Sequence, residues 1–497
     1  MKLKDLICSD FPELTQQLLS FSADCLERDI CHISSDSRAI KKGWMFVAIA
    51  GNKLNGHDFI SQALQLGATA VVIDSCNLYC YPDNLKFDVP IIVVDNTRRF
   101  LAIISTRLYG AHPEKIFAVT GTAGKTSVAF FVRQIFQYLG LSASQIGTEG
   151  LIPFLQHNES RLTTPSPVYL SRLLPLLVSK GVTHLSIEAS SHGLDQHRLD
   201  GIKFFAGAFT NLGRDHLDYH KTIDAYFDAK MLLFERLLPK GAPAVIFADN
   251  EFSEKVIMRA KTAGCHVLSV GNNGQFIRIK QLISINGKQR VKFSIDGKNY
   301  DIIFPVHGEF QVYNAFVAAG LCLSTGINVD DVIKSLEQLS LVPGRFEYIG
   351  DNSRGGKIYV DYAHTPDSLK TMLKSIRNIF SGKIILVFGC GGDRDVGKRR
   401  IMGQIALKMS DVAIVTDDNP RTEDPVSIRS DIIDGCSGFI EEGSRQDAIR
   451  MAISMLNADD VLVVAGKGQE KVQIIKDGEK MLSVDCEIIR EILLGSL

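Results

Sequence analysis

Short apolar runs that end in polar residues recur along the whole chain. In the first 110 residues these runs cover 43–51, 68–75 and 89–96, and each predicts a buried strand. The pattern returns at 116–119, 182–191, 205–212 and 242–250, and again at 357–365, 383–392, 411–420 and 460–469. Residues 127–140 have helical spacing instead and end at a glycine. Strands that alternate with helices predict an α/β protein with parallel sheets.

Two polar, proline-containing joints interrupt this series, at 111–115 and 341–345. A chain of 497 residues is also too long for a single hydrophobic core. We therefore expect three α/β domains, 1–110, 111–342 and 343–497. The middle one contains the stretch GTAGKTS at 121–127, which ends like a phosphate-binding loop, so it is expected to be a P-loop-type ATPase domain with a parallel sheet. It would lie between an N-terminal α/β domain and a C-terminal Rossmann-like domain.

Composition narrows the class of protein. With 45% hydrophobic and 22% charged residues, the chain resembles an ordinary globular protein. The net charge of -1 provides no electrostatic reason to expect nucleic acid or an anionic membrane as partner, and no apolar run is long enough for a membrane span. The ten cysteines are scattered without zinc-site spacing, so we expect reduced, buried thiols and a cytoplasmic location.

The stretch 117–127, FAVTGTAGKTS, ends like a phosphate-binding loop but begins differently. Val119 stands where a Walker A motif has its first glycine. Even so, Gly121 and Gly124 allow a tight turn with exposed N–H groups, Lys125 adds a positive charge, and the hydroxyl of Thr126 suits Mg²⁺. A predicted strand before the loop and a helix after it favour a nucleotide-phosphate site over an ordinary turn.

Polar residues follow the next predicted strands, where open parallel sheets bind their ligands. They are Glu188 with Ser190, Ser191 and His192, and then Asn211, Asp215, His216 and Asp218. A carboxylate and an imidazole beside the Thr126 hydroxyl are suitable metal ligands. A single histidine is more often a hydrogen-bonded core residue, but the aspartates around His216 favour function.

Nine motifs occur in one order over nearly the whole chain and resemble the Mur ligase family. They are VTGTAGKTS, IEASSHGLDQHR, TNLGRDHLDYH, YFDAKMLLF, VPGRFE, VDYAHTPDSL, GCGGDRDVGKR, DNPRTEDP and GKGQE. The resemblance implies an ATP-dependent, ADP-forming ligase of peptidoglycan precursor synthesis. Such an enzyme phosphorylates a carboxylate, and an amine then displaces phosphate from the acyl phosphate. The motifs match the members that add the third residue of the stem peptide.

The resemblance also implies roles for the polar residues. Lys125 and the loop N–H groups would hold the β- and γ-phosphates, Thr126 and Glu188 one Mg²⁺, and His216 a second. Lys230 matches a lysine that CO₂ converts to a carbamate, which orients the second Mg²⁺. The local pattern alone predicts a solvated lysine on an amphipathic helix at this position.

Further nucleotide contacts follow from the same resemblance. Asn314 matches the residue that contacts adenine, and Arg345 and Asp361 match residues that reach ATP from the hinge and the third domain. His364 and Lys398 belong to motifs that close over the nucleotide. The complete expected ATP set is Gly121, Thr122, Ala123, Gly124, Lys125, Thr126, Ser127, Asn314, Arg345, Asp361, His364 and Lys398.

The two other substrates have their own matching positions. Uridine would lie on the first domain, at Ser35, Ser37, Asn52, Lys53 and Leu54. The muramoyl-dipeptide would be held by Thr163, Thr164, Ser190, Gln196 and Arg198. Some relatives have asparagine before the two threonines, where this chain has Leu162, so a contact from that side chain is lost.

The incoming amine is expected to be meso-diaminopimelate, because family members with the sequence D-N-P-R add this amino acid. Arg421 could pair bidentately with its second carboxylate, and Glu470 suits an ammonium group. The expected pocket comprises Arg394, Asp418, Asn419, Pro420, Arg421, Gly466 and Glu470. Gln469 replaces the histidine that many relatives have. Without the resemblance, Arg421 could simply cap a turn.

Several alternatives stay open at this point. They are an L-lysine-adding ligase, a folylpolyglutamate synthetase, a P-loop kinase or GTPase and a non-enzymatic nucleotide-binding module. The expected partners are small molecules, namely ATP with Mg²⁺, the UDP-N-acetylmuramoyl-dipeptide and meso-diaminopimelate. We expect a monomer without nucleic acid or membrane insertion.

Overall fold

The computed structural model describes residues 1–7, 17–18, 26–51, 54–76, 89–154, 162–285, 288–475 and 479–495, with residues 17–18 as backbone only. They form two compact units, Met1–Ala118 with Leu141–Gly207 and Leu232–Ala242, and Val119–Gly140 with Ala208–Met231 and Pro243–Leu497. The domain boundaries at 110 and 342 stay a prediction. Across the described ranges, no helix is long and apolar enough to cross a membrane.

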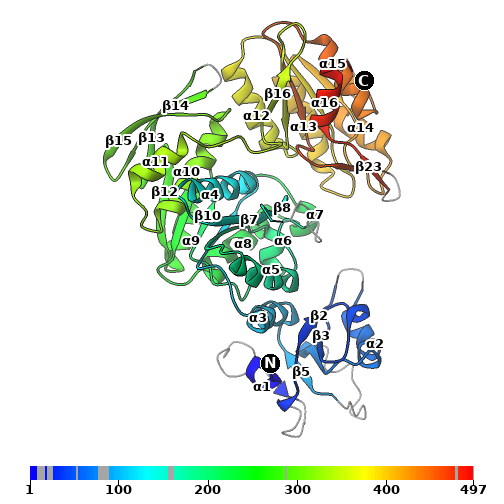
Figure 1. Cartoon of the computed structure of the whole chain (residues 1–497). Helices are drawn as coiled ribbons and strands as arrows, with labels where there is room; N and C mark the ends of the chain where they lie inside the picture. The colour runs from blue at the N-terminus through cyan, green and yellow to red at the C-terminus, as the bar shows by residue number, and fades with distance from the viewer. Residues whose placement is uncertain are drawn as a thin grey trace. The chain divides into compact units, whose positions relative to one another are not determined.

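The N-terminal sheet of the first unit has five strands in the order β1-β5-β4-β3-β2. They are β1 (Gln17–Leu18), β2 (His32–Ser34), β3 (Trp44–Val47), β4 (Ala70–Asp74) and β5 (Ile91–Val94). Strands β2 to β5 are parallel. One core lies between the sheet and helices α1 (Leu3–Ile7) and α3 (Thr97–Tyr109), and another lies beneath α2 (Ile60–Gln65) on the other face (Figure 1). Because both faces of β3, β4 and β5 are buried, these strands are almost wholly apolar, whereas the edge strand β2 is partly buried and carries His32 and Ser34.

The largest sheet has ten strands in the order β15-β14-β13-β12-β11-β10-β6-β9-β7-β8. Its bounds are β6 (Lys115–Thr120), β7 (Ala143–Gly147), β8 (Gly150–Ile152), β9 (His184–Glu188), β10 (Ala206–Phe209), β11 (Pro243–Phe247), β12 (His266–Gly271), β13 (Ile277–Ile285), β14 (Lys288–Ile295) and β15 (Lys298–Phe304). The predicted strands at 116–119, 182–191, 205–212 and 242–250 are confirmed. The antiparallel β13, β14 and β15 were missed, because their buried and exposed residues alternate and no apolar run marks them.

The helices of this middle region are α4 (Lys125–Tyr138), α5 (Pro167–Ser179), α6 (Ser191–Asp195), α7 (Leu217–His220), α8 (Ile223–Leu232), α9 (Ser253–Thr262), α10 (Glu309–Leu323) and α11 (Val329–Leu336). Helix α4 packs against α10, and α5 packs against α3. Nearly every residue of α10 from Gln311 onward is buried, which explains its almost wholly apolar sequence. This packing places α10 beside the phosphate-loop helix.

The last sheet has six strands in the order β16-β17-β21-β18-β19-β20. They are β16 (Glu347–Asp351), β17 (Lys357–Asp361), β18 (Ile384–Phe388), β19 (Val412–Val415), β20 (Phe439–Glu441) and β21 (Val461–Ala465). All are parallel except β16. Two short antiparallel strands, β22 (Val472–Ile474) and β23 (Lys480–Leu482), follow.

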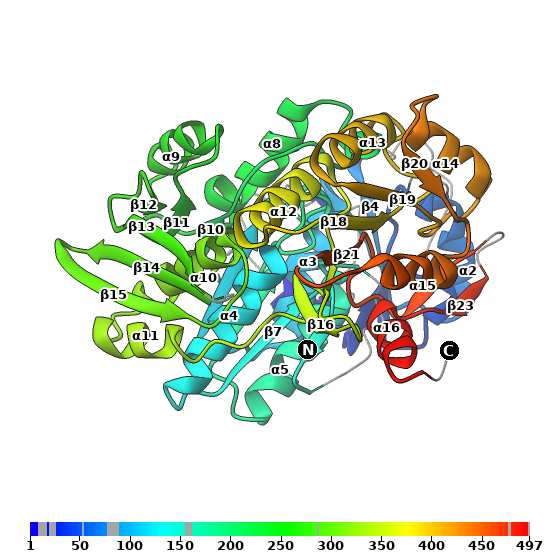
Figure 2. The ribbon, with the colours of Figure 1, turned by 90° about the horizontal axis from the view of Figure 1, so that it is seen from above.

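Helices cover both faces of this sheet. Helices α12 (Pro366–Ile379), α13 (Gly397–Met409) and α14 (Pro425–Ile433) share one core with it, and α15 (Arg445–Met455) and α16 (Asp485–Leu493) share the other. Figure 2 shows α12 and α13 on one side of β18 and β19, and α15 and α16 on the opposite side. The predicted Rossmann-like arrangement is therefore confirmed.

The cysteines only partly follow the expectation of buried thiols. Among the described residues, Cys265, Cys322, Cys390 and Cys486 are buried, but Cys31, Cys76 and Cys436 are exposed. The prediction is wrong for these three, because a residue's burial depends on how its element packs rather than on residue type.

Candidate active site

The phosphate loop joins β6 to α4. Helix α4 begins at Lys125, two residues earlier than the apolar pattern predicts, so Lys125 and Thr126 lie in its first turn. Gly121 and Gly124 have φ values of +148° and +87°, and a Cβ at Gly124 would lie 2.4 Å from the Oδ1 of Asn314. The loop is therefore a glycine-dependent cradle at a helix N-terminus, which suits phosphate. Asn314, predicted to contact the nucleotide, does lie beside it.

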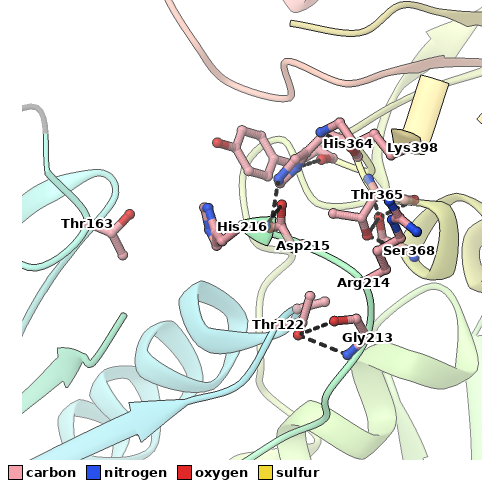
Figure 3. A network of polar contacts seen from close by, with 12 residues as sticks. Thr122, Thr163, Gly213, Arg214, Asp215, His216, His364, Thr365, Ser368 and Lys398 are labelled. Atoms are coloured by element: carbon pink, nitrogen blue, oxygen red, sulfur yellow. Dashed lines mark hydrogen bonds and ion pairs between the residues drawn. The ribbon is translucent and has the colours of Figure 1, made fainter. Parts of the chain in front are cut away.

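The segment after β10 supports the loop. The Asn211 Oδ1 accepts from the Ala123 N–H at 2.9 Å, and the Thr210 hydroxyl donates to the Ala123 carbonyl at 2.6 Å. The Gly213 N–H donates to the Thr122 hydroxyl at 3.0 Å (Figure 3). The Lys125 Nζ donates to the carbonyls of Gly121 and Thr122 at 2.8 and 2.9 Å. These bonds hold the lysine and the loop N–H groups in one place.

Lys230 is 1% exposed, so the solvated surface position predicted from the local pattern is wrong. Its Nζ donates to the Gly121 carbonyl at 2.8 Å and lies 4.2 Å from the centre of the Tyr226 ring. Burial, and next the positive charge of Lys125, hold the pKa of Lys230 well below its usual range. A lysine amine in this position is poised to be neutral and nucleophilic.

Asp215 lies between two histidines. Its Oδ2 is 3.3 Å from the Nε2 of His216 and 3.8 Å from the Nε2 of His364 (Figure 3). Burial favours the neutral carboxyl, but the hydrogen bond from His364 and the nearby positive charges outweigh it and hold the pKa of Asp215 well below its usual range. Asp215 therefore joins the two histidines, whereas the sequence analysis named it only as a neighbour of His216.

The predicted nucleotide residues of the six-stranded sheet also converge on the loop. An Arg345 Nη donates to the Thr126 hydroxyl at 3.3 Å, and its guanidinium lies 3.9 Å from the centre of the Tyr362 ring. The Lys398 Nζ donates to the His364 carbonyl at 2.8 Å. Together with the cradle, these side chains supply several cationic groups for a polyphosphate.

Asp361 ends β17 and supports this group from within the core. Its carboxylate accepts from the N–H groups of Phe346 and Ala363 at 2.6 and 2.7 Å. Burial raises the pKa of Asp361 to about 6, although the charge of Arg345 acts in the opposite direction. Asp361 therefore fixes the turns that carry Arg345 and His364.

Two further contacts join the same segments. The Arg214 guanidinium pairs with the Asp395 carboxylate at 2.9 Å, and the Arg214 N–H donates to the Asp367 carboxylate at 2.9 Å. A Cβ at Gly213 would lie 2.3 Å from the same Asp367 carboxylate, so a larger residue there would displace that carboxylate. These residues link the segment after β10 to the first turn of α12 and to the loop before α13.

The residues predicted to hold the muramoyl-dipeptide gather within the first unit. The Thr164 hydroxyl donates to the Glu188 carbonyl at 2.7 Å and lies 2.9 Å from the Ser190 hydroxyl. The Arg198 guanidinium donates to the Thr164 carbonyl at 2.8 Å and to the Gln196 side chain at 2.7 Å. The Thr163 hydroxyl lies 3.2 Å from the Thr148 hydroxyl, so Thr163 contacts the same group through Thr148.

Glu188 is the last residue of β9 and is 1% exposed. The Thr148 N–H donates to its carboxylate at 3.0 Å. A Cβ at Gly147 would lie 1.9 Å from the same carboxylate, so a glycine at this position makes room for the acid. The sequence did not single out Gly147, which ends the buried strand β7, or Thr148, which follows it.

The predicted uridine residues that the structure describes belong to the first unit. Ser37 is buried and its hydroxyl donates to the Gln62 side chain at 2.7 Å, whereas Ser35 and Leu54 are exposed. Asn52 and Lys53 lie outside the described residues.

The predicted amino-acid pocket lies at the carboxyl edge of the six-stranded sheet. The Asn419 amide donates to the Glu470 carboxylate at 3.0 Å, and the Arg421 guanidinium donates to the Gly392 carbonyl at 2.6 Å. A Cβ at Gly466 would lie 2.7 Å from the Asp418 carboxylate, and Arg394 is exposed. Burial, and next the charge of Asp418, raise the pKa of Glu470.

Comparison with known proteins identifies the family. Three family models match successive parts of the chain: the Mur ligase family catalytic domain at 29–109, the Mur ligase middle domain at 119–322 and the Mur ligase glutamate ligase domain at 344–468. The UDP-N-acetylmuramoyl-L-alanyl-D-glutamate–2,6-diaminopimelate ligase of Agrobacterium fabrum is 49% identical over 96% of this chain and 95% of its own length. The chain belongs to the Mur ligase family.

Solved structures agree with this Mur ligase assignment. A UDP-N-acetylmuramoyl-L-alanyl-D-glutamate–2,6-diaminopimelate ligase is 30% identical, with a TM-score of 0.69 and coverage of 100% of this chain and 99% of that one. A Mycobacterium tuberculosis folylpolyglutamate synthase with bound nucleotide matches at 19% identity, a TM-score of 0.61 and coverage of 74% and 92%, which shows the shared fold alone. The predicted three-domain α/β architecture is confirmed, and this Mur ligase is an ATP-dependent enzyme that joins a carboxylate to an amine.

The residues of this Mur ligase fit one mode of Mg²⁺ binding. Within the described ranges, no group of three or more His, Cys, Asp or Glu side chains could hold a metal ion by itself. A nucleotide-bound Mg²⁺ needs fewer protein ligands, because phosphates and waters complete its shell. The Thr126 hydroxyl in the first turn of α4, beside a cradle that a Cβ would fill, fits this mode.

Proposed function

We propose that the chain adds meso-2,6-diaminopimelate to UDP-N-acetylmuramoyl-L-alanyl-D-glutamate with hydrolysis of ATP to ADP and phosphate. The observation that carries the proposal is the grouping of Asn419, Arg421, Gly466 and Glu470 at one sheet edge. The names of the similar Agrobacterium ligase and of the solved structure support it. We further propose that the enzyme acts in the cytoplasm as a monomer.

The chemistry proceeds through an acyl phosphate. A carboxylate oxygen of the D-glutamyl residue attacks the γ-phosphorus, and ADP leaves. The amine of diaminopimelate then attacks the acyl carbon, phosphate leaves with the bonding electrons, and the nitrogen loses a proton. Lys125, Arg345 and the loop N–H groups would stabilise the charge on the phosphates, and positioning supplies most of the remaining catalysis.

Mg²⁺ would neutralise negative charge on the transferring phosphoryl group. In this proposal Thr126 and Glu188 hold one ion, and His216 holds a second together with a carbamate on Lys230. The carbamate forms when the neutral Nζ attacks the carbon of CO₂ and then loses a proton. The complete burial of Lys230 and the positive charge of Lys125 nearby support this chemistry, because both favour an uncharged amine at the loop.

Selection of the amine would depend on its second carboxylate. Arg421 can pair with that group bidentately, and Glu470 can accept from an ammonium. L-Lysine lacks the carboxylate and would leave the guanidinium without its partner, which polar sites penalise strongly.

The test is ligation by the wild-type protein with ATP, the UDP-dipeptide and either amino acid, followed by ADP release and product mass. We expect meso-diaminopimelate to be ligated and L-lysine scarcely used. A folate acceptor with glutamate serves as the comparison for the folylpolyglutamate alternative. Equal turnover of both amino acids, or ligation of folate in their place, would contradict the proposal.

A further inference from the structure

A buried ion pair lies beneath the proposed amino-acid pocket. Arg445 is the first residue of α15 and Asp485 is the first residue of α16. Their side chains are 1% and 0% exposed, and the Arg445 Nε and an Nη each donate to one Asp485 oxygen at 2.7 Å. Such a two-bond arrangement fixes the plane and the position of the guanidinium.

The same guanidinium reaches the ends of two strands. One Nη donates to the Ala465 carbonyl at 3.0 Å, and the other contacts the Asp417 carbonyl at 3.5 Å. Ala465 ends β21 and directly precedes Gly466, while Asp417 lies after β19 and directly precedes Asp418. Strand β18 separates β21 from β19, so Arg445 spans two loops that do not follow each other in the sheet.

Lys467 makes a second contact that holds the loop from Gly466 to Glu470. It is 0% exposed, and its Nζ donates to the Ser483 carbonyl at 2.9 Å, two residues before Asp485. The Glu470 N–H in turn donates to the Lys467 carbonyl at 3.0 Å. The loop from Gly466 to Glu470 is therefore attached to the start of α16 as well as to α15.

We propose that Arg445 and Asp485, with Lys467, are positioning residues that set the geometry of the incoming amino acid's pocket. This inference rests on the proposed function, because that function assigns Asp418, Asn419, Gly466 and Glu470 to the pocket of the incoming amino acid. None of the three side chains needs to contact substrate. They act through the main chain of the two loops, and a small displacement of these loops would weaken the contacts of the pocket with the amino acid.

The test uses three variants of the full-length enzyme. Arg445→Lys keeps the charge but loses the guanidinium fork, Asp485→Asn keeps the size but loses the charge, and Lys467→Met removes the tie to Ser483. For each we would measure KM for meso-diaminopimelate, ATP and the UDP-dipeptide, and the thermal midpoint. We expect KM for the amino acid to rise about tenfold or more, with KM for ATP within about twofold of the wild type.

Arg377→Lys is the matched control. Arg377 also joins a carboxylate and a carbonyl of this sheet, since it donates to Asp411 at 2.7 Å and to the Gly382 carbonyl at 3.1 Å. Asp411 precedes β19 and Gly382 precedes β18, so both lie at the amino edge of the sheet, opposite the pocket. We expect its KM for the amino acid to stay unchanged.

A purely structural role predicts a lower kcat with an unchanged KM for every substrate, and that result would overturn the inference. Failure of all three variants to fold would also overturn it, because the group would then serve folding. If the wild type does not ligate meso-diaminopimelate, the proposed function fails first. If the wild type ligates meso-diaminopimelate and the variants have the same KM for it, only the positioning role fails.

Discussion

The Nζ of Lys230 and the carbonyl oxygen of Gly121 lie 2.8 Å apart although 109 residues separate them in the chain. This bond brings a buried lysine of α8 against the first glycine of the phosphate loop. Lys125 donates to the same carbonyl, so two lysines share one acceptor. Their mutual repulsion favours the neutral form of the more buried one, which is Lys230.

Replacing Lys230 with alanine is expected to lower kcat by about a hundredfold or more, because the proposed carbamate is lost. Short-chain carboxylic acids that fit the vacated space are expected to restore part of the activity. The measurement is ADP release with and without the acid. Lys240→Ala, an exposed lysine, serves as the control. Normal turnover by Lys230→Ala would contradict the carbamate role.

Replacing Lys125 with alanine is expected to remove ATP-dependent ligation and to leave the thermal midpoint and UDP-substrate binding largely intact. Its Nζ donates to the Gly121 and Thr122 carbonyls of the loop, so its charge lies at the cradle and serves mainly the phosphates. Calorimetric titration with the UDP-dipeptide and with ATP separates the two effects. Near-normal ligation would falsify the assignment of the cradle.

The ion pair of Arg214 and Asp395 is expected to support nucleotide use. Each alanine variant should raise KM for ATP, and a double-mutant cycle on kcat/KM should reveal a coupling of about 0.5–3 kcal/mol. The exposed pair of Arg290 and Asp301 provides the control cycle, with no coupling expected in kcat/KM. Additive effects of the Arg214 and Asp395 substitutions on kcat/KM would show that the ion pair does not contribute to nucleotide use.

Asp361 is expected to make stability depend on pH. Its folded pKa of about 6 lies above the ordinary 3.8, so between these values the folded protein holds a proton that the unfolded chain has lost. This group therefore lowers stability as pH rises through that window. Relative to the wild type, Asp361→Asn should gain about 2–3 kcal/mol in the free energy of unfolding from about pH 4 to pH 6. Urea titrations at several pH values measure it, and a pH-independent difference would refute the raised pKa.

Arg421→Ala is expected to lose most of the preference for meso-diaminopimelate over L-lysine. The reduction in kcat/KM should fall mainly on the diaminopimelate reaction, by about a hundredfold or more, since the charge-paired contact with its second carboxylate is removed. Competition between the two amino acids in one reaction measures it directly. An unchanged ratio would mean that Arg421 only supports the turn through its bond to the Gly392 carbonyl.

Much of this protein follows from the sequence by itself. Buried parallel strands need apolar side chains on both faces, so β3, β6, β18 and β21 were visible as apolar runs. The glycines of the phosphate loop were visible for an equally local reason, because only glycine readily adopts the backbone that Gly121 and Gly124 require. The resemblance of the motifs to the Mur ligase family indicated the chemical roles of the polar residues that follow these strands.

Only the tertiary structure decided how distant residues meet. The pattern around Lys230 resembles a solvated helix face, and its burial depends on contacts with a loop 109 residues away. The pairing of Arg214 with Asp395 and the span of Arg445 from β21 to β19 join segments that local spacing cannot relate. Local propensity acts within a few residues, whereas burial and ion pairing are set by the packing of the whole chain.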